Sequence, residues 1–412
     1  MKMERRAFLK TLGGASLAGT LGGYSAAIAQ VTGAGPAAAF PFADDKVPMN
    51  AANLCPMPSA ISSAVARYAG ELDVDMSDPN RRRIEAFKND ARAGIARQLG
   101  VKAEEIAVVR NTSEANNIFV QGMSLDAGDE VLLWDQNHPS NSVAWEVRAS
   151  RTGCTVRYFS IPLDTASIDE VVDLVAGSIG ERTRVLSFTH ISNVTGFRLP
   201  AAEICAAARR KAAGLHIHVD GAQTWGAVDV NLADIGCDSF SGSAHKWYMG
   251  PREVGMLFVR EAAQPNIWPG VVSVPWGDTA EPAVPGARKF EALGQRDDAA
   301  IAALAETVSF HDGITPAGIE RRSREIADLL REGLLEADVP FVSSVNPNFT
   351  SSVIILSAPQ ENRRALLENV LRDGGVILAG VNGLRLSPHY YNTPGHVERA
   401  VAAVAKSRDL LG

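Results

Sequence analysis

Short hydrophobic runs alternate with segments of helical periodicity along most of the chain. Six of the runs end beside a polar residue, at Arg110, Asp135, Ser160, His190, Asp220 and Ser243. A seventh run covers residues 255–260. Helical spacing is clearest at the apolar positions Ile84, Phe87, Ala91, Ile95 and Leu99. Strands that alternate with helices predict an α/β fold with a mainly parallel central sheet.

The C-terminal third has a different pattern, which predicts a smaller α+β domain. Apolar residues at positions 326, 329, 330 and 334 indicate a helix, and the run 353–356 indicates a strand. Two further helical segments follow. We therefore expect an N-terminal arm over residues 30–60, a large domain over residues 61–290 and a small domain over residues 291–412.

Two predicted strands end in side chains that suit a cofactor with an aldehyde group. One strand delivers Asp220 at its carboxyl end, and another is followed by His245 and Lys246. The carboxyl ends of parallel strands meet at one edge of a sheet, where open α/β folds bind ligands. A neutral lysine amine condenses with an aldehyde, and a carboxylate keeps a pyridine nitrogen protonated. Lys246 and Asp220 together suggest pyridoxal phosphate, although each alone also fits a solvated surface residue.

Other predicted strand ends carry polar residues with a possible role at the same edge. Thr112 and Ser113 open a helix, where an anion such as a phosphate binds well, but where Thr and Ser are also ordinary caps. His138 could lie over a planar ring or be a loop histidine. Asn193 could bind a cofactor or form a turn. Arg385, within a short alternating strand, suits a carboxylate if it faces inward and solvent if it does not.

These motifs occur together in an order that resembles the class V aminotransferase family. The resemblance rests on residues 110–116, 137–138, 192–196, 220–223, 243–246, 385–387 and 391–393, and it covers the chain from about residue 50 to its end. Family members include cysteine desulfurases, isopenicillin N epimerase and related carbon–sulfur lyases. The resemblance implies fold type I, with helices on both faces of the sheet, and a homodimer with sites at its interface.

The resemblance also implies a role for each matching residue. Lys246 carries the aldehyde of pyridoxal 5′-phosphate, Asp220 pairs with the pyridine nitrogen, and His138 stacks on the ring. Gln223 contacts the phenolic oxygen, Asn193 contacts cofactor and substrate, and Arg385 binds the substrate carboxylate. The resemblance implies that the phosphate is bound by Thr112, Ser113, Ser243 and His245. No metal ligand is expected.

Two positions depart from the family pattern. Desulfurases carry a cysteine on a loop shortly before the carboxylate-binding arginine, but residues 373–382 contain none. We therefore do not expect a persulfide-forming desulfurase. Relatives also place a threonine that reaches the phosphate of the neighbouring subunit where this chain has Gln295. Gln295 is thus a cofactor-binding candidate whose contact across the subunits is open.

The N-terminus and the composition bear on location and partners. Arg5 and Arg6 precede an apolar, glycine-rich stretch that ends at Ala29, which predicts a removable twin-arginine signal over residues 1–29. The mature protein is then periplasmic or secreted, exported in folded form by the twin-arginine machinery. A net charge of -7 gives no basic surface for nucleic acid. Four cysteines permit disulfides in an exported protein, but the sequence selects no pairing.

The sequence thus predicts a pyridoxal-phosphate enzyme that acts at Cα or Cβ of a small amino-acid substrate. An isopenicillin N epimerase-like enzyme or a carbon–sulfur lyase is favoured, and a class V aminotransferase is the alternative. These reactions share the same residues around the cofactor, so the branch stays open. A non-catalytic periplasmic binding protein on the same fold is the alternative of another class.

Overall fold

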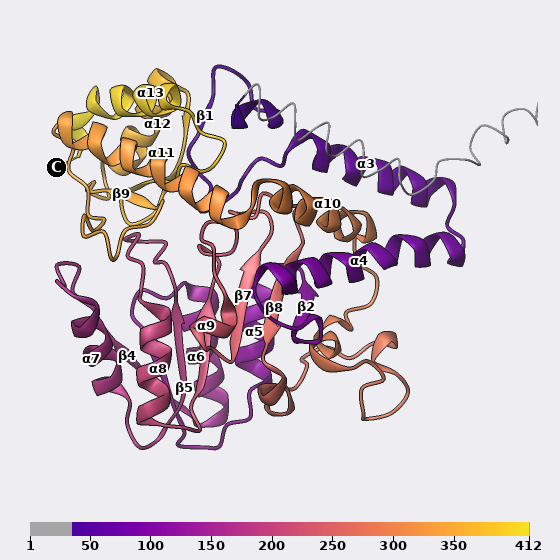
Figure 1. The fold of residues 1–412 in the computed structure, drawn as a ribbon. Helices are drawn as coiled ribbons and strands as arrows, with labels where there is room; N and C mark the ends of the chain where they lie inside the picture. The colour runs from indigo at the N-terminus through magenta and orange to yellow at the C-terminus, as the bar shows by residue number, and fades with distance from the viewer. Residues whose placement is uncertain (1–34, 412) are drawn as a thin grey trace, which may run out of the picture.

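The centre of the fold is a seven-stranded sheet with the strand order β2-β8-β7-β6-β5-β3-β4 (Figure 1). The computed structural model describes residues 35–411, so the predicted export signal lies outside the described residues. The strands of this sheet are β2 (Ile106–Val109), β3 (Glu130–Trp134), β4 (Thr155–Phe159), β5 (Thr183–Thr189), β6 (His216–Asp220), β7 (Ser239–Ser243) and β8 (Gly255–Val259).

The prediction of a mainly parallel sheet is confirmed, with one strand reversed. Strands β4, β3, β5, β6 and β7 pair in parallel, whereas β8 runs antiparallel to both β7 and β2. A parallel pair needs a long crossover, but only residues 244–254 separate β7 from β8. This short connection therefore forces the reversal, and it is the connection that carries Lys246.

Helices cover both faces of the sheet, as fold type I requires. Alternate residues of β3 enter different cores, because successive side chains of a strand point to opposite faces. Leu132 and Trp134 pack beneath helices α4, α7 and α8, whereas Val131 and Leu133 pack beneath α5 and α6. The helices of this part are α3 (Ser59–Val74), α4 (Asp78–Gln98), α5 (Thr112–Gly122), α6 (Pro139–Thr152), α7 (Ile168–Ser178), α8 (Ala201–Lys211), α9 (Leu232–Ile235) and α10 (Asp298–Ile314).

The C-terminal part forms the expected smaller α+β unit, which lies above the large sheet in Figure 1. Its antiparallel sheet has the order β11-β12-β9. The elements are α11 (Pro316–Glu336), β9 (Ile354–Leu356), α12 (Arg363–Gly374), β10 (Val376–Ile377), β11 (Ala379–Gly380), β12 (Leu384–Leu386) and α13 (Pro394–Ala405). The described residues also form short 3-10 helices, which are η1 (Pro36–Ala39), η2 (Ala103–Glu105), η3 (Glu261–Asn266), η4 (Val274–Trp276), η5 (Gly286–Glu291) and η6 (Arg408–Leu410).

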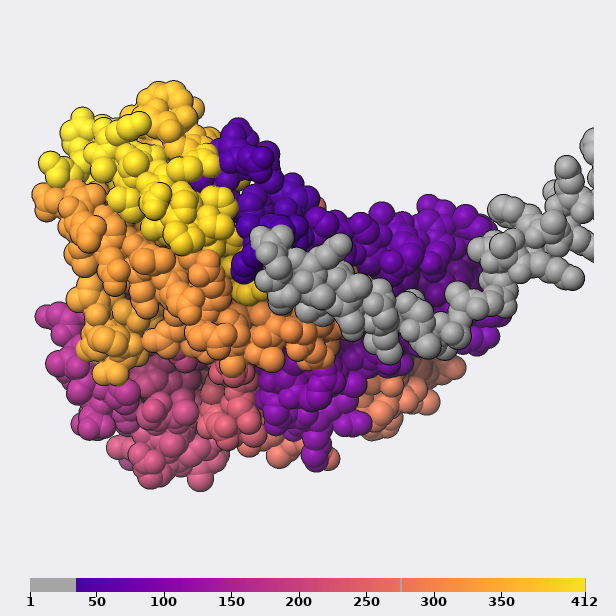
Figure 2. Space-filling model, turned by 45° about the horizontal axis from the view of Figure 1, so that its top comes forward, coloured from indigo at the N-terminus to yellow at the C-terminus, as the bar shows by residue number. Residues whose placement is uncertain are grey.

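The N-terminal arm ties the two parts together. Strand β1 (Val47–Pro48) pairs in parallel with β10 of the C-terminal unit. The arm then runs alongside Ser387: Ser387 N donates to Met49 O at 2.8 Å, and Ala52 N donates to Ser387 Oγ at 3.1 Å. In the space-filling view the orange and yellow C-terminal part lies above the magenta part of the chain, and the indigo and violet segment extends away from this body (Figure 2).

The outer edge of the large sheet is closed by side chains from η5 and the segment after it. β2 is the edge strand, and its Val108 N–H donates to Glu291 Oε1 at 2.6 Å, while Arg296 Nη1 donates to Val108 O at 2.6 Å. Burial opposes ionisation of Glu291, but Lys88 and Arg92 hold its pKa below the ordinary value. These contacts keep β2 in register ahead of the helix α5 that it leads into.

Removing this buried carboxylate is expected to destabilise the fold strongly. Glu291→Ala leaves Arg92 without its buried counter-ion and Val108 N without an acceptor, so we expect a loss of about 3–5 kcal/mol in the free energy of unfolding, measured by urea denaturation. The matched control is Glu261→Ala, whose pair with Lys102 is exposed and screened, and which should leave the midpoint nearly unchanged. Equal midpoints for the two variants would show that the cluster does not support β2.

Candidate active site

A cavity of about 180 Å³ opens at the carboxyl ends of the parallel strands. All the cofactor-binding residues expected from the sequence line it except Gln295. The lining residues are Asn111, Thr112, Ser113, His138, Ser140, Thr189, Asn193, Asp220, Ala222, Gln223, Ser243, His245 and Lys246. Residues that are up to 135 positions apart in the chain therefore meet because the strands that carry them end at one edge.

Asp220 is the last residue of β6 and is almost completely buried. Its Oδ1 accepts a hydrogen bond from Ala222 N at 2.9 Å, and its Oδ2 accepts one from Asn116 Nδ2 at 2.8 Å. The turn after it needs Gly221, because a Cβ there would lie 1.9 Å from Phe240 Cζ. Two donors thus fix the orientation of the carboxylate without a cation bound to it.

Lys246 lies in the tight connection between β7 and β8, where it is half-buried and lines the cavity. Burial lowers its pKa to about 8, Asp220 opposes this shift, and the positive charge of Arg385 adds to it. The next residue, Trp247, is buried and donates its indole N–H to Gln223 Oε1 at 2.7 Å, which anchors the connection. Lys246 is therefore placed as a reactive amine rather than as a surface cation.

The N-terminus of α5 forms the end of the cavity that suits an anion. Thr112 is the first helical residue, and its N–H and its hydroxyl both lie 2.8 Å from Ser243 Oγ. Burial and the charge of Lys246 lower the pKa of His245 to about 4, so His245 is neutral at physiological pH. Backbone amides, the helix dipole and the hydroxyls of Thr112, Ser113 and Ser243 are the groups that bind a phosphate well.

His138 caps the helix that follows β3. Its Nδ1 accepts a hydrogen bond from Ser140 N at 3.2 Å and lies 2.9 Å from Ser140 Oγ, so the proton of the neutral ring is on Nε2. Burial and then Lys246 lower the pKa of His138, whereas Asp220 raises it. The preceding Asn137 binds the backbone of β5 through both ends of its amide and so fixes where α6 begins.

Arg385 reaches the site from the small sheet of the C-terminal unit. It lies in the middle of β12, is 4% exposed, and donates from Nη1 to Asn193 O at 3.2 Å. Its buried Nε has no hydrogen-bond partner among the described residues. Burial lowers its pKa to about 10, which still leaves it charged at neutral pH. A buried guanidinium with a free donor beside a cavity suits a carboxylate.

Two predicted residues are engaged differently from the others. Gln223 lines the cavity, but its amide also donates to Ala52 O at 3.1 Å, so the N-terminal arm supports it. Gln295 is exposed and bonds to Arg81 and Asp298. Within one chain Gln295 does not join the other site residues, and its contact with a cofactor stays a prediction that depends on a second copy.

Sequence reasoning missed several lining residues. Thr189 ends β5 and could have been found by the same strand-end rule that indicated Asp220. Asn111 caps α5, accepting from Glu114 N at 3.0 Å, and Ser140 lies within a motif already noted for His138. Asn116 does not line the cavity but touches Asp220 from behind. Among the described residues no cluster of His, Cys, Asp and Glu could hold a metal ion.

Comparisons with known proteins identify the family of this site. The family model described as Aminotransferase class-V matches residues 58–399. The chain belongs to the class V aminotransferase family. Isopenicillin N epimerase from Streptomyces clavuligerus is 30% identical over 377 residues, which cover 87% of this chain and 94% of that protein. A cysteine desulfurase from Cronobacter sakazakii is 32% identical over 377 residues, which cover 85% of this chain and 87% of that protein.

Solved structures support the same fold. The cystine C–S lyase C-DES, in complex with its reaction product cysteine persulfide, has a TM-score of 0.81 and 23% identity, and the match covers 88% of this chain and 98% of that chain. The cysteine desulfurase CsdA from Escherichia coli has a TM-score of 0.79 and 23% identity, with 91% and 98% covered. This class V chain therefore has the expected fold type I architecture.

Pyridoxal 5′-phosphate is the cofactor of this class V family, and the residues of the cavity fit it. The amine of Lys246, with its lowered pKa, suits the aldehyde. The oriented carboxylate of Asp220 suits the pyridine nitrogen, and the N-terminus of α5 suits the phosphate. The neutral His138 can lie against the ring. These residues lie around one cavity, and their individual roles stay predictions.

The lowered pKa of Lys246 predicts how cofactor attachment depends on pH. Only the neutral amine reacts, so the rate at which the cofactor-free enzyme takes up pyridoxal phosphate should rise as pH increases through about 8 and then level off. The growth of visible absorption after mixing measures this rate between about pH 6 and 10. Lys246→Ala is the control and should give no such absorption. A rate that continues to climb above about pH 9 would mean that the amine is an ordinary lysine.

Proposed function

We propose that this class V enzyme removes the Cα proton of an amino acid and then either accepts a proton at Cα on the other face or eliminates a sulfur group from Cβ. The observation that carries this proposal is that Lys246 and Asp220 line one cavity, while the buried and partly unpaired Arg385 lies close enough to lower the pKa of Lys246. Bound pyridoxal phosphate supplies the electron sink that makes the Cα proton acidic. The residues of the chain supply binding, orientation and proton transfer.

Each residue has a distinct task in this proposal. Arg385 binds the substrate carboxylate, which gives its buried Nε a partner. Lys246, whose pKa of about 8 is close to physiological pH, accepts the Cα proton as general base and can return it as general acid. Asp220 keeps the pyridine nitrogen protonated, and His138 covers the ring. Asn193, whose carbonyl holds Arg385, contacts the substrate side.

The relatives support epimerisation and carbon–sulfur elimination more than transamination. Two isopenicillin N epimerases, from Streptomyces clavuligerus and Amycolatopsis lactamdurans, are 30% and 31% identical to this chain, and a cystine C–S lyase shares its fold. We therefore favour an epimerase-like enzyme or a carbon–sulfur lyase. Transamination by a class V aminotransferase needs the same residues and is the alternative.

We also propose that the enzyme forms no persulfide on a cysteine. No cysteine lines the cavity, and Cys55, Cys154, Cys205 and Cys237 are all buried and free of disulfides. Cys55 is the one held near the site, since its N–H donates to His245 O at 2.8 Å. Its thiol points at the Tyr391 hydroxyl, 3.6 Å away, and burial raises its pKa to about 12. Such a thiol is a poor nucleophile.

Replacement of this thiol tests the persulfide proposal. Cys55→Ser keeps the size and the contact with Tyr391, so turnover of any sulfur amino acid should stay within about threefold of the wild type. Mass spectrometry of the wild-type enzyme after incubation with L-cysteine measures sulfur bound to the protein directly. Loss of turnover in this variant, or a mass gain of one sulfur on Cys55, would contradict the proposal.

The reaction products distinguish an epimerase, a lyase and an aminotransferase. We expect the enzyme loaded with pyridoxal phosphate to exchange the Cα proton of at least one amino acid for deuterium in a panel of L-, D- and thioether amino acids. Exchange without keto acid selects the epimerase, ammonia with pyruvate selects the lyase, and keto acid with aminated cofactor selects the aminotransferase. Lys246→Ala is the control. Ligand binding that is the same in both proteins, with no exchange and no visible absorption, would instead favour the non-catalytic binding protein.

Export and assembly complete the proposal. The N-terminal motif supports twin-arginine export to the periplasm or the medium, which fractionation of cells that express the full chain checks. Within the described residues no helix is long and apolar enough to cross a bilayer. A homodimer is supported by exposed apolar side chains, of which Val74 is 90%, Met76 78% and Val274 93% exposed, and sedimentation velocity checks it.

A further inference from the structure

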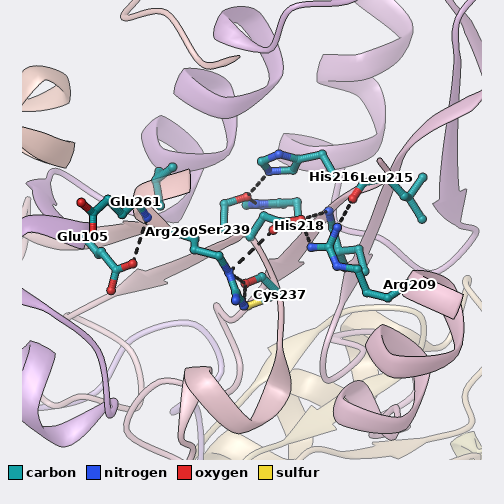
Figure 3. Close-up of polar contacts among 12 residues, drawn as sticks. Glu105, Arg209, Leu215, His216, His218, Cys237, Ser239, Arg260 and Glu261 are labelled. Carbon is teal, nitrogen blue, oxygen red and sulfur yellow. Dashed lines mark hydrogen bonds and ion pairs between the residues drawn. The ribbon is translucent and has the colours of Figure 1, made fainter. Parts of the chain in front are cut away.

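Two neighbouring strands of the large sheet carry polar residues on one face. His216, His218 and Asp220 alternate along β6, and Ser239 and Ser241 lie beside them on β7, because His218 pairs with Ser239 and Asp220 with Ser241. All five side chains are buried. Figure 3 shows His216, Ser239 and His218 linked by hydrogen bonds within this row. A buried polar row is costly unless every group has a partner.

Helix α5 closes this row with two residues one turn apart. Phe119 stacks on both imidazoles, with ring centroids 4.8 Å from His216 and 4.4 Å from His218. Asn116 makes the polar contacts of the same helix face: its Oδ1 accepts from Ser241 Oγ at 2.7 Å and from His218 Nε2 at 3.1 Å. The Asn116 amide is therefore held by two donors on its oxygen side.

The donors and acceptors in this row follow from the protonation states of its side chains. Burial lowers the pKa of His216 to about 4 and that of His218 to about 3, so both rings are neutral. The Oδ1 of Asn116 can only accept, so His218 carries its proton on Nε2 and its Nδ1 accepts from Ser239 Oγ at 2.8 Å. His216 Nε2 then donates to Ser239 Oγ at 3.0 Å.

The other end of the Asn116 amide points at the active site. Its Nδ2 donates to Asp220 Oδ2 at 2.8 Å and to Ser140 Oγ at 3.3 Å. Ser140 in turn lies 2.9 Å from His138 Nδ1. Asn116 is fully buried and makes four hydrogen bonds, so its amide cannot turn over without placing an oxygen against the carboxylate.

We propose that Asn116 is a positioning residue, which orients the Asp220 carboxylate toward the pyridine nitrogen and, through Ser140, steadies the ring of His138. The donor is a neutral amide, so the negative charge of Asp220 is left for the cofactor and is not paired with a cation of the protein. Lys246 and Arg385 are charged groups that act on the site, and Arg252 acts on His245. This inference rests on the cofactor assignment and not on the reaction branch.

Two variants of Asn116 and one matched control test it, with the cofactor as probe. Asn116→Leu removes the donor at similar size. Asn116→Asp keeps the shape but replaces the donor with a carboxyl group, which can donate to Asp220 only while it is protonated. Asn117→Asp makes the same change at the adjacent residue of α5, which is exposed. The readouts are the visible absorption of the bound cofactor against pH, its dissociation constant, and the rate of Cα exchange.

We expect Asn116→Leu to lower kcat for Cα exchange by about tenfold to a hundredfold with KM within about twofold, because the lost bond goes to a charged group that acts on chemistry rather than on substrate binding. Asn116→Asp should add an ionisation to the pH titration of cofactor absorption, with weaker cofactor binding as pH rises through it. A purely structural role would not produce that ionisation. Asn117→Asp should titrate like the wild type.

Three outcomes would overturn the inference. If both Asn116 variants titrate like the wild type and keep kcat within about twofold, Asn116 does not act through Asp220. If Asn116→Leu loses thermal stability without its cofactor but Asn116→Asp adds no ionisation, the role is structural. A wild-type protein that binds no pyridoxal phosphate would remove the cofactor assignment as well, which separates that failure from the other two.

Discussion

The structure depends on keeping an amine and a carboxylate together at one cavity. Burial disfavours the charge of Lys246, the carboxylate of Asp220 favours it, and the guanidinium of Arg385 disfavours it again. The balance leaves a pKa of about 8, at which the lysine can both react with an aldehyde and carry a proton. A more exposed lysine would be protonated and unreactive at neutral pH. The other contacts of the site maintain this balance.

The sheet supports this cavity because successive side chains along a strand point to opposite faces of the sheet. On β6, one face buries apolar residues such as Ile217 and Val219 in the core, while the other face carries His216, His218 and Asp220. The polar face gives up hydrophobic burial in the middle of the fold, which costs stability unless all donors and acceptors are paired. Its neutral histidines, stacked on Phe119, satisfy that condition without adding charge near Asp220.

Most of the fold and the inner site could be predicted because both follow from local rules. Asp220 ends β6, and Thr112 and Lys246 follow shortly after the ends of β2 and β7, so all three lie at one edge of the sheet. Asn116 lies within the motif of residues 110–116, but its contact with Asp220 could not be predicted, because that contact forms only when α5 is packed on β6 and β7. The support of Gln223 by the N-terminal arm is also a tertiary contact that no spacing encodes. Gln295 needs a second chain before its role can be tested.

The position of Arg385 brings a cation from the C-terminal unit close to Lys246. The guanidinium comes from the small sheet, whereas Lys246 and Asp220 come from the large one, so the two units must keep their places for all three to act together. An unpaired buried donor such as its Nε costs about 1–3 kcal/mol. In the proposed function a substrate carboxylate recovers this cost, whereas a simple amine does not. The proposed binding of a substrate carboxylate therefore rests on a donor that the fold leaves without a partner among the described residues.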